Sequence, residues 1–112
     1  FLRCTDARVD LMKEIAALAP YARHLHVHDS FGRLSESWAI DDAERAGLGE
    51  GDLHLPLGWG AIDWDEMAKV CRFDAGTVVN LELHRRYWAE LPRQVELVRA
   101  LAGKLAAAPA TV

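Results

Sequence analysis

The sequence predicts an α/β fold with parallel strands, and two kinds of segment support that prediction. Residues 23–30 alternate polar and aliphatic side chains and residues 77–84 are β-branched and apolar, both typical of strands, while the stretches around them repeat apolar residues at helical spacing. Strands that alternate with helices pair in parallel through right-handed crossovers. The 112 residues, 51% hydrophobic and 27% charged, suit one globular unit over 1–112.

The first predicted element is a helix. Thr5 or Asp6 is a suitable N-cap, and Pro20 stops the helix. Between them, apolar residues recur at helical spacing at Val9, Met12, Ile15, Ala16 and Ala19.

The first predicted strand is RHLHVHDS, residues 23–30, with a histidine at every second position. A strand projects residues i, i+2 and i+4 to one side. The three histidines, His24, His26 and His28, therefore share one face, and Leu25 and Val27 form an aliphatic face opposite.

A long connection and a second helix follow. Residues 30–61 are rich in Gly, Ser and Asp, with a helical turn or two expected over 37–46, and connections of that length are usually functional loops. Asp63 lies three residues before Glu66, in a capping arrangement, and Ile62 and Met67 occupy the positions of a hydrophobic staple. We therefore expect a helix over 64–72.

The last predicted elements are a strand and a helix. The strand, TVVNLELH at 77–84, places Asn80, Glu82 and His84 on one side and aliphatic residues on the other. Pro92 can begin the final helix, and residues 108–112 are expected to be a frayed tail. The apolar stripe of that helix is Val95, Val98, Leu101, Ala102 and Leu105.

The predicted order is helix, strand, long loop, helix, strand, helix. Two parallel strands are not a stable sheet alone, because both outer edges stay unpaired. We therefore expect the C-terminal part of a (β/α)8 TIM barrel, with the remainder of the barrel as its partner. Its lumen would receive the histidine face and Glu82, and imidazole with carboxylate is a donor set for a divalent metal.

Charge and cysteine content exclude several classes of protein. The formal net charge of −4 gives no broad attraction to nucleic acid or to an anionic membrane, which favours small-molecule chemistry. Cys4 and Cys71 form no CxxC motif, so a reducing cytoplasm is the expected location. No segment approaches the roughly 20 apolar residues of a membrane span.

Three ordered motifs then resemble a known group of proteins. H-V-H-D-S, D-L-H-L-P-L-G-W-G-A-I-D-W and V-N-L-E-L-H are similar to the C-terminal part of the xylose isomerase-like TIM-barrel superfamily, over about residues 7–105. That group includes sugar phosphate isomerases and epimerases and endonuclease IV-type (AP endonuclease family 2) enzymes. The resemblance implies that His26 and Glu82 are metal ligands, and that Asp52 and His54 match a pair used for an additional ion.

The resemblance also implies an activity. A Mn, Mg, Co or Zn ion would polarise a sugar carbonyl and stabilise an enediolate, with Glu82 as a ligand that also moves the proton. Asp29-Ser30-Phe31-Gly32 replaces the Glu-x-Asn-Arg of tagatose-type epimerases, and D-L-H-L-P replaces the D-R-H-E of endonuclease IV. We therefore expect a sugar (phosphate) isomerase or epimerase. The alternatives are metal-dependent phosphodiester hydrolysis at abasic DNA, and an inactive barrel fragment.

Other residues keep two readings each. Asp52 and His54 either bind a metal or contact substrate, or they only stabilise the loop. Asp29 can be a loop cap, and Gly58 and Gly60 are turn formers rather than a phosphate cradle. The family's remaining ligands would come from strands outside these residues, so we expect residues 1–112 alone to be inactive. The predicted substrate-binding residues, each with a structural alternative, are His28, Trp59 as a sugar-stacking ring, and His84 and Arg85 at the mouth.

Overall fold

The centre of the molecule is a two-stranded parallel sheet, seen here in a computed structural model that describes residues 1–35, 38 and 41–106. Strand β1 spans His24–Val27 and β2 spans Val78–Leu81. Their register pairs His24 with Val78 and Val27 with Leu81. The predicted parallel α/β arrangement is confirmed, and each strand is shorter than the segment that predicted it. The barrel stays a prediction.

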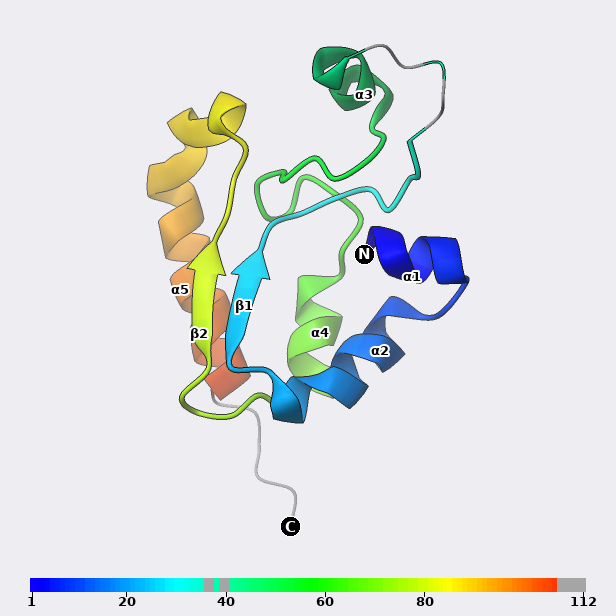
Figure 1. The fold of residues 1–112 in the computed structure, drawn as a ribbon. Coiled ribbons are helices and arrows are strands. Elements are labelled where there is room, and N and C mark those ends of the chain that lie inside the picture. The colour runs from blue at the N-terminus through cyan, green and yellow to red at the C-terminus, as the bar shows by residue number, and fades with distance from the viewer. Residues whose placement is uncertain (36–37, 39–40, 107–112) are drawn as a thin grey trace.

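Helices cover one face of this sheet. Helix α2 (Leu11–Leu18), α4 (Trp64–Val70) and α5 (Leu91–Ala106) supply most of the core. Leu25, Val27, Val79 and Leu81 pack against that core from the strands. In Figure 1, α5 runs along β2, α4 and α2 lie on the β1 side, and helix α3 (Asp42–Leu48) stands apart beyond the carboxyl ends of the strands.

The opposite face of the sheet is uncovered in the described part of the chain. His24, His26 and Asn80 are exposed there, and Val78 is 53% exposed. The alternation in RHLHVHDS therefore has the predicted result, with aliphatic residues inward and imidazoles outward. Because the sheet has two strands, β1 and β2 each also keep one unpaired edge among the described residues.

The N-terminal region differs from its prediction. A short helix, α1 (Leu2–Ala7), ends at Arg8 in the left-handed region with φ 56°, so neither Thr5 nor Asp6 begins the long helix. Asp10 caps α2 instead, its carboxylate accepting from the Lys13 backbone N–H at 2.9 Å. After α2, a short 3₁₀ helix, η1 (Ala19–Tyr21), contains Pro20 and ends this helical region.

The later helices agree better with the sequence. Asp63 caps α4 by accepting from the Glu66 N–H at 2.9 Å, as predicted, although the helix ends at Val70. A 3₁₀ segment, η2 (Arg85–Glu90), precedes α5 and was not expected. On α5, Gln94 is buried where the pattern had indicated Val95, which is 38% exposed.

The long connection contains one helix. Helix α3 begins after Asp41, whose carboxylate accepts from the Glu44 N–H at 2.8 Å. It overlaps the second half of the predicted 37–46 turn. Residues 36, 37, 39 and 40 and the predicted tail at 108–112 lie outside the described residues.

Candidate metal centre

The carboxyl ends of the two strands bring His28 and Glu82 together. The register ends at Val27 opposite Leu81, so the next residue on each chain is His28 and Glu82. The Glu82 N–H donates to the Val27 carbonyl at 3.0 Å, which continues the ladder by one bond. Adjacent parallel strands thus present an imidazole and a carboxylate at the same edge, where ligands bind in open α/β sheets.

The loop between α3 and α4 adds His54. Its carbonyl accepts from the His84 N–H at 3.1 Å, and the next residue, Leu55, pairs with Asp29 in an isolated antiparallel bridge. Loop backbone is thereby fixed to the ends of both strands. His54 has φ 48°, a left-handed conformation that is uncommon for a residue other than glycine and is often found at functional sites.

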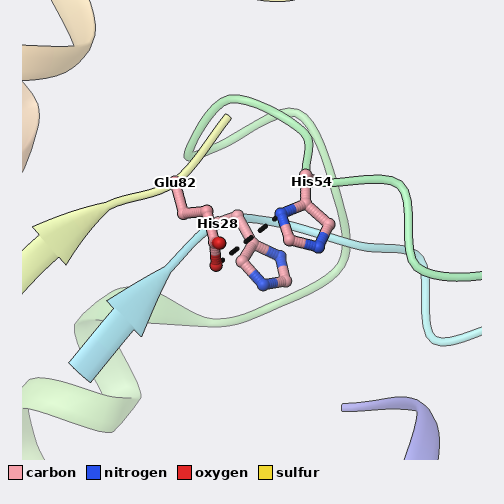
Figure 2. A group of neighbouring side chains, drawn as sticks. All are labelled: His28, His54 and Glu82. Atoms are coloured by element: carbon pink, nitrogen blue, oxygen red, sulfur yellow. Dashed lines mark ion pairs between the residues drawn. The ribbon is translucent and has the colours of Figure 1, made fainter. Parts of the chain in front are cut away.

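His28, His54 and Glu82 form the donor cluster of the site, as Figure 2 shows. One possible ligand atom from each residue lies within 4.8 Å of the other two, and Glu82 Oε2 is 3.8 Å from His54 Nδ1. Two donors on one ion at about 2.0–2.2 Å are at most about 4.4 Å apart. The limit of about 4.4 Å holds for donors on opposite sides of an ion, so three donors around one cation have to lie closer together than the 4.8 Å of this cluster. The residue types fit a cation, and the side chains have to adjust before all three can bind it.

The orientation of the His28 and His54 rings determines which side chain has to move when a cation binds. The His28 and His54 rings stack with centroids 3.9 Å apart and planes at 12°. The lone pair of an imidazole nitrogen lies in the ring plane, so two nearly parallel rings do not point at one ion. One ring has to rotate before both can bind the same cation.

Two further side chains hold the cluster. Asp52 Oδ2 lies 2.9 Å from His54 Nε2, so the other ring nitrogen of His54, Nδ1, is the one that faces Glu82. His26 Nδ1 lies 3.0 Å from Glu82 Oε2, which is hydrogen-bond distance. Glu82 is therefore the carboxylate shared by the imidazoles of His26 and His54.

His28 is the most enclosed of these histidines. Its Nδ1 is buried and has no hydrogen-bond partner in the described part of the chain; the nearest carboxylate oxygen, on Asp52, is 3.9 Å away. Burial, and next the neighbouring His54, lower the pKa of His28, and Asp52 and Glu82 offset this only in part. The ring is therefore neutral near pH 7, the form that binds a metal, and its contact with Asp52 is not a salt bridge.

The predicted ligands and substrate residues divide into two groups. His26, Asp52, His54 and Glu82 gather at one place, and His28, which we predicted as a substrate contact, lies among them. Trp59 lies elsewhere, in a groove between α4 and α5 on the helical side of the sheet. Its ring is roughly perpendicular to that of Tyr87, with centroids 5.7 Å apart.

The residues after β2 line hollows beside the cluster, and His84 and Arg86 share one of these with Asp52. His84 Nδ1 accepts from the Arg86 backbone N–H and from its guanidinium, both at 3.2 Å. Arg85 is exposed at the start of η2. His84, Arg85, Arg86 and Trp88 line an open hollow of about 700 Å³.

Asp29 is the residue whose importance the sequence did not indicate. It is fully buried, and its two oxygens accept three hydrogen bonds from the loop that follows and one from Trp64 at the start of α4. The strand-end position was visible in the sequence, but nothing in the pattern told a loop cap from a buried carboxylate. The place of His28 opposite Glu82, by contrast, could have been found by aligning the two strand ends.

A cavity of about 420 Å³ adjoins the cluster. It runs beside the unpaired edge of β1, lined mainly by apolar side chains of α2, β1 and α4, with His26, His28 and Asp52 among its polar lining residues.

Comparisons with protein-family models, with curated proteins and with solved structures gave no match to this chain. No helix in the described ranges is long and apolar enough to cross a bilayer.

Proposed function

We propose that this chain is part of a metal-dependent sugar (phosphate) isomerase or epimerase, in which Glu82 and its neighbouring histidines hold a divalent cation. The observation that supports this most is the position of the Glu82 carboxylate. Its Oε2 lies 3.0 Å from His26 Nδ1 and 3.8 Å from His54 Nδ1, at the carboxyl ends of adjacent parallel strands. Active sites of barrel enzymes are built at that end of the strands.

The donor chemistry limits the choice of ion. Imidazole and carboxylate together suit Mn, Co and Zn, and Mg only with additional oxygen donors. When bound, such a cation would polarise a carbonyl oxygen of an aldose or ketose. Glu82 is 42% exposed, so it is accessible to a substrate and could accept a proton from the carbon beside that carbonyl.

In this proposal, the remaining strands of a barrel complete the active site. The uncovered histidine face and the unpaired edges of β1 and β2 are where neighbouring strands would pack and bring the second acid–base group and further ligands. Cys4 and Cys71 are both free thiols, which suits the proposed cytoplasmic location.

The test uses the gene product purified as the cell makes it. The protein is stripped with a chelator, reloaded separately with Mn, Mg, Co and Zn, and incubated with aldoses, ketoses and their phosphates in D₂O. We expect metal-dependent exchange of a sugar C–H proton, lost in Glu82→Gln. Metal-dependent cleavage of an abasic DNA duplex without exchange would favour the phosphodiesterase alternative. Neither activity with any loaded metal would favour the inactive fragment.

A further inference from the structure

Asp29, the second residue after β1, occupies an unusual position. Its side chain is 0% exposed, and each carboxylate oxygen accepts two hydrogen bonds. Oδ1 accepts from the backbone N–H groups of Ser30 (2.9 Å) and Ile62 (3.2 Å). Oδ2 accepts from the Gly58 N–H (2.8 Å) and the Trp64 indole N–H (2.9 Å).

These bonds fasten the loop at several points. The Asp29 backbone also exchanges two hydrogen bonds with Leu55, N to O at 2.8 Å and O to N at 3.0 Å. The segment from Leu55 to the start of α4 is thereby tied to one residue at the end of β1. Gly60 packs so closely on Asp29 and Ser30 that a Cβ at that position would collide with them.

Both histidines of the donor cluster are next to this fixed point in the chain. His28 precedes Asp29, and His54 precedes Leu55. His54 is held with φ 48°, a conformation that relaxes unless surrounding contacts impose it. The Asp29 to Leu55 pairing is one of those contacts, and the bond from the His84 N–H is another.

We propose that Asp29 is a positioning residue of the cation site, which acts by holding the loop so that His54 meets His28 and Glu82. This inference rests on the proposed function. Its chemistry requires a carboxylate. Asparagine has the same shape, but its NH₂ group would replace an oxygen that accepts two N–H donors, whichever way the amide is turned.

The test compares Asp29→Asn with Asp63→Asn in the gene product as the cell makes it. Asp63 accepts one bond at an exposed helix N-terminus, where asparagine caps as well as aspartate, so it is a matched control for loss of charge. Titration with Co²⁺ gives an affinity and a ligand-field spectrum. We expect Asp29→Asn to weaken binding on the order of tenfold or more, as for other residues that orient metal ligands. The control should stay within about twofold of wild type.

A double-mutant cycle separates positioning from general destabilisation. In a His54→Ala background, Asp29→Asn should cause no further loss of Co²⁺ affinity, because the residue that it positions is gone. An equal loss in both backgrounds would overturn the proposal, as would wild-type affinity in Asp29→Asn. If Asp29→Asn does not fold, Trp64→Phe removes one of the four donors, and a smaller loss that also vanishes in the His54→Ala background is expected. A Trp64→Phe loss that persists in that background would overturn the proposal.

A readout without metal keeps the proposal distinct from the proposed function. Wild-type protein that binds no Co²⁺ would overturn the cation site. The position of His54 would then be judged from its ring-proton NMR signals, which its stacking on His28 shifts. Displacement of those signals in Asp29→Asn but not in Asp63→Asn would still support the positioning role. Unmoved signals would overturn it.

Discussion

Gln94 gives the clearest stability prediction, because it joins α5 to the loop of the candidate site. The side chain is 1% exposed, its Oε1 accepts from the Leu57 N–H at 2.7 Å, and its Nε2 donates to the Leu57 carbonyl at 3.4 Å. Gln94→Met keeps the length of the side chain and removes both bonds. A buried N–H left without a partner costs about 1–3 kcal/mol, and the longer bond adds less. We expect the free energy of unfolding to fall by about 2 kcal/mol.

Urea unfolding, followed by tryptophan fluorescence, measures this loss. The midpoint should move to lower urea with an unchanged slope, since the surface exposed on unfolding is nearly the same. Glu96→Met is the control, because it introduces the same side chain at an exposed position of α5 and should change stability by no more than about 0.5 kcal/mol. If Gln94→Met were as stable as this control, the bonds to Leu57 would contribute nothing and the reasoning would be refuted.

Four further predictions concern the site and its supports. His26→Ala should weaken cation binding at least about tenfold by calorimetry, and unchanged affinity would remove it from the site. Asp63→Ala should cost about 1 kcal/mol by loss of the α4 cap, whereas Asp63→Asn should cost little; equal losses in urea melts would count against the cap. Burial lowers the pKa of His28, so the metal-free folded state prefers the neutral ring. The stability that the neutral His28 ring contributes is fully present above the ordinary pKa of 6.5 and decreases as the pH falls below that value. His28→Asn should reduce this pH dependence in thermal melts at several pH values. Residues 1–112 expressed alone should be aggregated, oligomeric or molten, with the remainder of the barrel restoring order; a cooperatively melting, active monomer would overturn the barrel proposal.

Local patterns in the sequence predicted the parts of the fold that depend on local physics. The period of two in His24–Val27 places Val27 in the core at 4% exposure and the histidines on the other face. Asp63 caps α4 through a bond to a residue three positions away. Both features depend only on residues within a few positions of each other, so a local sequence pattern is enough to predict them.

The parts that failed depend on contacts between distant residues. Asp29 is bonded to residues 29–35 positions later in the chain, and no local pattern indicates such a partner. Gln94 is buried for the same kind of reason, because the Leu57 backbone needs a donor and an acceptor from α5. The predicted cap at Thr5 or Asp6 was wrong, because Asp10, directly before Leu11, caps the helix instead.

A cation titration tests the central claim most directly. Calorimetry with Zn²⁺ and Mn²⁺ would be run on the chelator-stripped gene product, on Glu82→Gln and on Glu96→Gln, which removes a carboxylate from the exposed side of α5. The account predicts saturable binding by wild type and by Glu96→Gln, and a loss of at least about tenfold in affinity for Glu82→Gln. Equal binding by Glu82→Gln and wild type would contradict it, because the shared carboxylate of the cluster would then hold no ion.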